Sequence, residues 1–195
     1  MPLSRDEARF PLVPTLRATL GVKGHRPRVG TWDNKDQVYC FAALDLVSGR
    51  LTTRLLDSPA RVKAVTGRSK VRRLQAAFAA HLRDIARAYP PAGHPRVVVV
   101  IDNAPWHRGA PIRQLLAEQP HLTLYRLLPS YSPHLNVVER LWRVLRRRAT
   151  HNRLFETMAA LRRALRASLC YYQTLRPKVL SLIRAPKNVA QSAAA

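Results

Sequence analysis

Two carboxylates, Asp102 and Glu139, occupy positions where an acidic side chain points to chemistry. Asp102 ends the β-branched run Arg96–Ile101, which predicts a strand buried on both faces of a sheet. Ligands gather at the carboxyl ends of strands in open α/β sheets, so a reactive role is one interpretation of Asp102. The other is a structural turn, because Asp102-Asn103 is also turn-forming chemistry.

Glu139 lies on a predicted helix that opens with Ser132 as N-cap and Pro133 at the first helical position. At 100° per residue, Glu139 falls at the edge of the apolar stripe. That stripe consists of Leu135, Val138, Trp142 and Leu145. A carboxylate turned toward a core needs a cation. The cation is either a metal ion or Arg143, which is placed for an i,i+4 ion pair.

Basic residues form a ridge beside Glu139, and the whole chain is strongly basic. Arg140, Arg143 and Arg147 share one helix arc, and 34 basic against 11 acidic residues leave a net charge of +23. This excess predicts a nucleic-acid partner, with the ridge in contact with DNA phosphates. A solvated helix face is the alternative for the ridge itself.

Paired carboxylates beside a phosphate chain suit divalent metal ions. Two such groups about 4 Å apart repel by about 4 kcal/mol at an effective dielectric of 20, and a cation between them reverses that cost. Oxygen ligands favour Mg²⁺ or Mn²⁺. Two such ions would support in-line displacement at phosphorus.

The elements that must position these residues predict an α/β fold with a mixed central sheet flanked by helices. The 195 residues fit one domain over residues 1–185, with a disordered tail over 186–195. No stretch approaches the roughly 18 apolar residues of a membrane span, so a cytoplasmic protein without membrane contact is expected. The predicted order is a hairpin over 37–47 and 51–56, a helix over 71–89, a strand over 96–101, a helix over 111–118, a strand over 122–128, a helix from 133 and a helix over 154–172.

Two segments resemble a known family. Residues 101–107 (IDNAPWH) and 128–142 (LPSYSPHLNVVERLW) closely resemble the second and third motifs of bacterial insertion-sequence transposases of the mariner superfamily. The resemblance implies an RNase H-like fold in which Asp102 and Glu139 are catalytic metal ligands. Asp6, in the segment DEARF, is the implied third ligand, and Asp45 is the fallback. Met1–Arg5 is too short and polar for a good strand before Asp6, so the N-terminus is expected to be cut into the fold.

The same resemblance implies roles for further residues and partners. Asn103 and Asn136 would orient the carboxylates, and His107 would lie near them, orienting a phosphate or water or serving structurally. The implied activity is strand cleavage and transfer at transposon ends by a nucleoid-associated homodimer, with a helix-turn-helix module fused or separate. Two alternatives stay open. One is an inactive remnant that binds DNA without cutting it, and the other is a nuclease acting on RNA hybrids.

Overall fold

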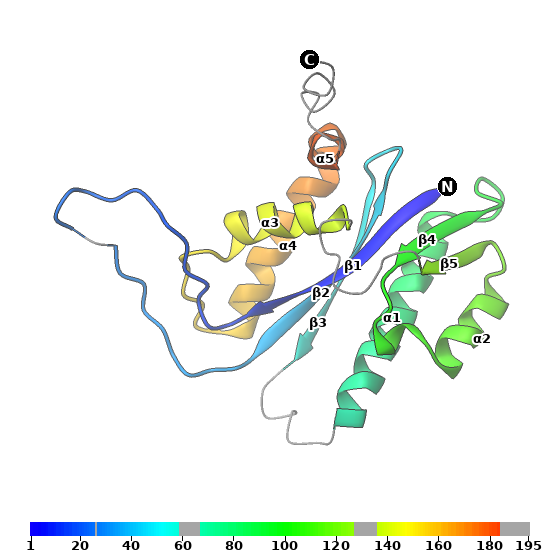
Figure 1. Cartoon of the computed structure of the whole chain (residues 1–195), viewed down its shortest axis with the longest axis horizontal. Helices are drawn as coiled ribbons and strands as arrows, with labels where there is room; N and C mark the ends of the chain where they lie inside the picture. The colour runs from blue at the N-terminus through cyan, green and yellow to red at the C-terminus, as the bar shows by residue number, and fades with distance from the viewer. Residues whose placement is uncertain (26, 59–66, 127–135, 184–195) are drawn as a thin grey trace, which may run out of the picture.

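The structure is a computed structural model that describes residues 1–25, 27–58, 67–126 and 136–183. Within these residues, helices cover both faces of one five-stranded sheet (Figure 1). Two predictions lie outside the described residues. They are the cap at Ser132-Pro133, with Leu135 of the stripe, and the tail over 186–195. The helix predicted to run from residue 133 begins only at Val138, because Asn136 and Val137 before it are not helical.

The sheet is mixed, as the sequence predicts. Its strands lie in the order β3-β2-β1-β4-β5. β1 pairs antiparallel with β2, which pairs antiparallel with β3, whereas β1–β4 and β4–β5 are parallel pairs. The strands are β1 (Pro2–Pro11), β2 (Gln37–Asp45), β3 (Leu51–Ser58), β4 (Val97–Ile101) and β5 (Leu122–Arg126). The predicted hairpin and the predicted parallel crossover are both confirmed.

The first strand corrects the expectation that the residues before Asp6 make a poor strand. β1 begins at Pro2 and lies in the middle of the sheet, so Asp6 stands within a strand and not at its end. The polar residues of this strand are buried because each has a partner. Arg5 bonds to Glu7, and the Ser4 hydroxyl donates to Asn136 Oδ1. Hydropathy alone does not detect a buried strand whose polar side chains are buried with partners.

One face of the sheet is covered by α1 (Gly67–Ala88) and α2 (Ala110–Glu118), which the sequence predicts. A short 3-10 helix, η2 (Pro105–His107), precedes α2. Phe78, Leu82 and Ile85 of α1 pack with alternate residues of β4, which are Val97, Val99 and Ile101. The β-branched run forms β4, and Asp102 lies immediately beyond the carboxyl end of that strand.

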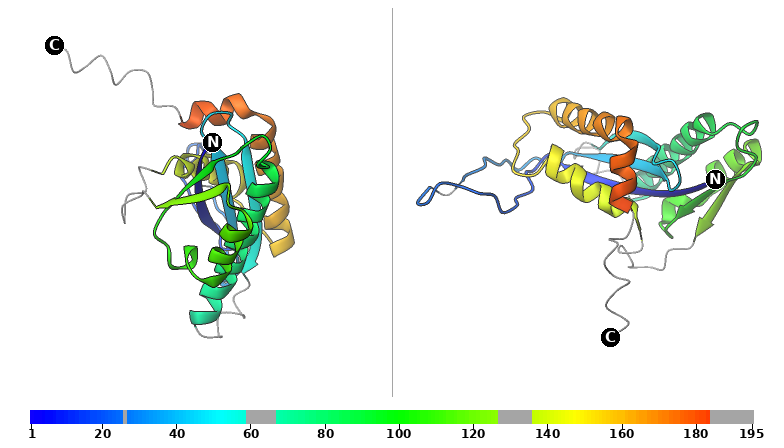
Figure 2. Two further views of the ribbon diagram at one scale, coloured as in Figure 1. Left: turned by 90° about the vertical axis from the view of Figure 1, so that its right-hand side faces the viewer. Right: turned by 90° about the horizontal axis from the view of Figure 1, so that it is seen from above.

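The opposite face is covered by α3 (Val138–Ala149), α4 (Met158–Thr174) and α5 (Arg176–Ile183) (Figures 1 and 2). α4 begins later than the predicted residue 154, because the Thr157 side chain accepts a hydrogen bond from Ala160 N and caps the helix there. The separate helix α5 was not predicted, although Pro177 within its first turn is a typical start signal. In the described part of the chain, no helix combines the length and apolarity needed to cross a bilayer.

Between β1 and β2 the chain leaves the sheet and returns, as Figure 2 shows. This excursion is tied to the residues after α3. Thr15 Oγ1 lies 2.9 Å from His151 Nδ1, and Arg17 N donates to Asn152 Oδ1. Leu12 N donates a hydrogen bond to Asp36 O, and this bond closes the base of the excursion next to the C-terminal end of β1.

Candidate active site

Asp6 lies on the face of β1 that packs against α3. It is 9% exposed, and its Oδ2 accepts a 2.9 Å hydrogen bond from Trp142 Nε1. Burial raises the pKa of Asp6 to about 7, with further contributions from the negative charges of Glu7 and Glu139. Within the described residues the predicted apolar stripe is confirmed, since Val138, Trp142 and Leu145 are fully buried, and Trp142 anchors this carboxyl.

Glu139 lies in the first turn of α3, and Asn136 fixes where that turn sits. Asn136 Oδ1 accepts hydrogen bonds from Val138 N at 3.2 Å and from the Ser4 hydroxyl at 3.4 Å. These bonds tie the start of α3 to β1, two residues before Asp6. The alternative ion pair is not formed, because Glu139 and Arg143, both in the described part of the chain, lie outside salt-bridge distance.

Asp102 follows β4, the parallel neighbour of β1. Ser4 pairs with Val100, so the same register carried two residues further places Asp102 level with Asp6. Its side chain, however, is turned to its own loop. Oδ1 accepts from Ala104 N at 3.1 Å and lies 3.0 Å from His107 Nδ1. The hydrogen bond from His107 lowers the pKa of Asp102, against the opposing effect of burial.

The three predicted ligands are thus placed on neighbouring elements but do not form a closed cage. Asp6 and Glu139 are near enough for one charge to act on the other, whereas Asp102 is held by His107. Among the described residues, no group of three or more His, Cys, Asp and Glu side chains is close enough to hold a metal ion. The structure places Asp6 on β1 where the charge of Glu139 acts on it from α3, and it places Asp102 directly after the neighbouring strand β4.

A buried charged network, which sequence reasoning missed, lies on the other face of β1. Arg5 is 1% exposed, and its Nη1 contacts both Glu7 Oε2 and His107 Nε2. Its guanidinium also lies over the Phe78 ring, 4.4 Å from the centroid. Burial raises the pKa of Glu7, but the Arg5 charge and the hydrogen bonds from His107 and Trp106 outweigh it and lower that pKa to about 2. The sequence does carry one signal of this network. Arg5 and Glu7 have opposite charges and flank Asp6, and residues two apart on a strand lie on the same face.

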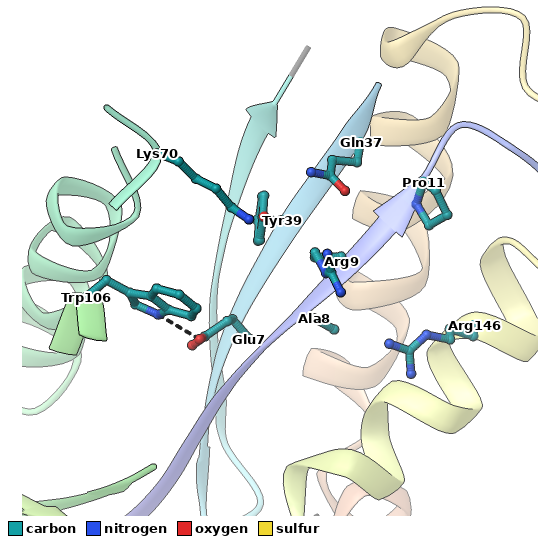
Figure 3. A pocket seen from close by; sticks show the side chains of 9 residues that line it. All are labelled: Glu7, Ala8, Arg9, Pro11, Gln37, Tyr39, Lys70, Trp106 and Arg146. Carbon is teal, nitrogen blue, oxygen red and sulfur yellow. Dashed lines mark hydrogen bonds between the residues drawn. The ribbon is translucent and has the colours of Figure 1, made fainter. Parts of the chain in front are cut away.

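A hollow of about 650 Å³ lies beside this network, along the part of β1 that extends past β4. Figure 3 shows basic side chains from three elements around it: Arg9 of β1, Lys70 of α1 and Arg146 of α3. Glu7 lies at its side, accepting a 2.8 Å hydrogen bond from Trp106 Nε1. These three cations, which the sequence did not single out, give the hollow the charge of a phosphate-binding surface.

The predicted ridge divides into two kinds of residue. Arg143 and Arg147 are exposed. Arg140 Nη1 instead donates to the carbonyl oxygens of Leu182 and Ile183 at 3.2 and 3.3 Å, so it caps the C-terminal end of α5.

Two further candidates have local roles. Asn103 is exposed, and its Oδ1 lies 3.5 Å from Arg108 Nη2, so it orients no carboxylate. The fallback residue Asp45 is fully buried, and its Oδ1 accepts from the backbone of Val47 and Ser48. Asp45 therefore shapes the turn between β2 and β3.

Comparison with known proteins places these features in a family. The chain is 28% identical over 162 residues to the insertion element IS630 uncharacterized 39 kDa protein of Shigella sonnei, covering 83% of this chain and 42% of that protein. It superposes on the Mos1 mariner paired-end complex with Mn at a TM-score of 0.60 and 19% identity, covering 93% of this chain and 53% of that one. On the catalytic domain of Mos1 mariner transposase the TM-score is 0.56 at 17% identity, with 93% and 78% covered.

The chain thus spans about half the length, or less, of the first relatives it matches. Its mixed sheet and flanking helices have the RNase H-like fold of the Mos1 catalytic domain. The family described as DDE superfamily endonuclease matches residues 3–162, which include Asp6, Asp102 and Glu139. The chain is therefore a member of the DDE superfamily endonuclease family.

Proposed function

We propose that this chain is the catalytic domain of a DNA transposase, and that Asp6, Asp102 and Glu139 hold divalent ions that drive strand cleavage and transfer at transposon ends. The observation that carries the proposal is the buried Asp6 on β1, within the electrostatic reach of Glu139 on α3 and level with Asp102 just beyond the adjacent strand β4. Family membership supports the same chemistry.

The Asp6 environment suits a cation. A carboxyl with a pKa of about 7 is costly to ionise where it stands, because it is buried and faces other negative charges. A divalent ion would remove that cost, and oxygen donors favour Mg²⁺ or Mn²⁺, in the two-ion arrangement that the sequence predicts. Mos1 has been described with Mn and with Mg. Bound ions would supply activation of the attacking hydroxyl and stabilisation of the leaving oxygen.

The residues of this chain would do the remaining work. Trp142 fixes one oxygen of Asp6, and Asn136 fixes the turn that carries Glu139. DNA phosphates would contact the cations near the site, which are exposed Arg9 and Lys70 and half-buried Arg146 at the hollow, and exposed Arg143 and Arg147 on α3.

DNA ends are the proposed substrate. Mos1 is described in a paired-end complex with a left transposon end. We extend the proposal to two copies of this chain on DNA at the nucleoid, with a helix-turn-helix recognition module fused or separate.

A nicking assay on supercoiled DNA with Mn²⁺ or Mg²⁺ tests the activity. Asp102→Asn and Glu139→Gln should abolish nicking, because each removes one charge from the ion site while keeping its shape. Glu118→Gln is the matched control, since Glu118 is exposed on α2 and contacts Gln114. Equal nicking by the two site variants and the control would refute the assignment.

One observation favours a second candidate, a DNA-binding protein that does not cut. Asp102 faces His107, and the described residues hold no cluster of three donors. Calorimetric titration with Mn²⁺ separates the two. The enzyme should bind the ion tightly enough to saturate under assay conditions, whereas the non-cutting protein should bind DNA tightly and the ion only weakly.

A further inference from the structure

The two consecutive acidic residues of β1 face opposite sides of the sheet. Asp6 points to α3 and Trp142, whereas the side chain of Glu7 is only 8% exposed on the α1 side. Glu7 is fully engaged there. Its Oε1 accepts from Trp106 Nε1, and its Oε2 contacts Arg5 Nη1 and lies 3.4 Å from His107 Nε2. A carboxylate this buried is stable only when it is paired. Glu7 is therefore not an ordinary solvated surface charge, and its role must be sought in its partners.

His107 connects Glu7 to Asp102. Its ring is 1% exposed and packs against Phe78, with centroids 4.4 Å apart. Nε2 faces Glu7 and Arg5, while Nδ1 lies 3.0 Å from Asp102 Oδ1. The ring is thus held at one nitrogen by residues of β1 and presents the other nitrogen to the carboxylate after β4.

The chemistry of these groups fixes the hydrogen on Nδ1. A carboxylate only accepts, so Nδ1 must carry hydrogen to bond Asp102. At Nε2 the ring can donate to Glu7 or accept from Arg5, and in both cases Nδ1–H remains directed at Asp102.

The consequence appears at Asp102. Its Oδ1 accepts a hydrogen bond from Ala104 N and lies 3.0 Å from His107 Nδ1, which also bonds the backbone carbonyl of Asp102 at 3.2 Å. Its Oδ2 has no hydrogen-bond partner among the residues that the structure describes. One oxygen is therefore immobilised by the protein, and the other remains available as a ligand.

We propose that Glu7 is a positioning residue that acts through His107, orienting Asp102 so that only its free oxygen binds the divalent ion. This inference rests on the proposed function, because it needs Asp102 to be an ion ligand. The central strand would then serve the site from both faces, supplying Asp6 directly and orienting Asp102 indirectly.

The test is Mn²⁺ affinity of the full chain, measured by the electron paramagnetic resonance signal of free Mn²⁺. Partners that orient a metal ligand typically change metal affinity by about 10–100-fold when mutated. Glu7→Gln should therefore weaken Mn²⁺ binding by about that factor, while the matched control Glu118→Gln binds as the unaltered chain does. In steady-state nicking, Glu7→Gln should lower kcat without raising the KM for DNA, because it removes a negative charge beside the basic hollow.

A double-variant cycle separates positioning from a general structural role. If Glu7 acts through Asp102, then Glu7→Gln should have no further effect on Mn²⁺ affinity in the Asp102→Asn background. An equal loss in both backgrounds overturns the proposal.

Replacing Glu7 leaves buried Arg5 without its carboxylate, so this variant can fail to fold. His107→Phe then carries the test, because a phenyl ring keeps the contact with Phe78 and cannot donate to Asp102. The same 10–100-fold weakening is expected.

The outcomes distinguish this inference from the proposed function. Wild-type affinity in Glu7→Gln and His107→Phe, together with weakened binding in Asp102→Asn, overturns the positioning role alone. Wild-type affinity in Asp102→Asn overturns both.

Discussion

Replacing Asp6 by Asn removes the most costly carboxyl of the site while keeping its shape. The amide oxygen can still accept the hydrogen bond from Trp142 Nε1. The pKa of Asp6 is raised from its ordinary 3.8 to about 7. At about 1.4 kcal/mol per pKa unit, ionising this carboxyl in the folded state costs about 4 kcal/mol. The residue is 9% exposed, so solvent screening removes little of this cost.

The direction of the pH dependence follows from linkage. The folded-state pKa of Asp6 lies above its unfolded value, so the stabilising contribution is complete below pH 3.8 and is lost as pH rises through about 7. Asn does not titrate. The free energy of unfolding of Asp6→Asn, relative to the unaltered chain, should therefore increase by about 3 kcal/mol between pH 5 and pH 8.

The comparison must be between variants, because His81 titrates with the opposite sign. Burial lowers the pKa of His81 to about 3, helped by the nearby Arg5 charge. Its stabilising contribution is present above the ordinary pKa of 6.5 and is lost as pH falls through about 3. The two residues offset each other over much of this range, and only the difference between variants isolates Asp6.

Urea unfolding at pH 5 and pH 8 with a chelator present measures this difference, and Glu118→Gln again serves as the control. A gap between Asp6→Asn and the unaltered chain that stays constant with pH would refute the reasoning about burial. Adding Mn²⁺ at pH 8 should then stabilise the unaltered chain more than Asp6→Asn, because an ion bound only by the folded state adds its binding free energy.

Three further changes have defined outcomes. Arg143→Ala with Arg147→Ala should reduce the log-log salt slope of DNA binding by about 1.8, measured by anisotropy from low to moderate salt, if each arginine neutralises one phosphate; an unchanged slope would remove them from the interface. Trp142→Phe should lower the free energy of unfolding by about 1–3 kcal/mol, because Oδ2 of Asp6 loses its donor; if nothing changes in urea unfolding, that bond does not stabilise the fold. Gly49→Ala should cost at least about 1 kcal/mol, because φ is +71° and the new Cβ would lie 2.7 Å from Arg176 O; a neutral result would mean that the turn and α5 shift together.

The fold could be predicted from the sequence wherever burial is apolar. The hairpin, α1, β4 and the parallel β4–β5 pair follow from hydrophobic periodicity, because those elements bury Val, Leu, Ile and Phe. β1 could not be predicted in this way. Its buried polar side chains depend on partners more than a hundred residues away, such as His107 for Arg5 and Asn136 for Ser4.

The residues of the site differ in the same way, since some follow from local sequence patterns and others depend on distant partners. Asp102 and Glu139 could be located because each follows or interrupts an apolar pattern that is local in sequence. The roles of Arg140 and Glu7 could not, because they are set by tertiary neighbours. Arg140 sits on the predicted basic arc yet bonds the last carbonyls of α5, a helix that was not foreseen. The role of Glu7 depends on a tertiary contact, because β1 must lie beside the loop that carries His107.

The central strand couples stability and activity with opposite signs at adjacent residues. Glu7 has a pKa lowered to about 2, so its ionised form is favoured by the fold, whereas the pKa of Asp6 is raised to about 7 and its ionised form is disfavoured. Neutralising Glu7 should therefore destabilise the protein, and neutralising Asp6 should stabilise it at neutral pH. A carboxyl that the fold would rather keep protonated persists for a reason other than stability, since stabilising substitutions at functional positions typically cost function. Asp6→Asn should be at once the more stable protein and an inactive one, a combination that a purely structural Asp6 would not produce.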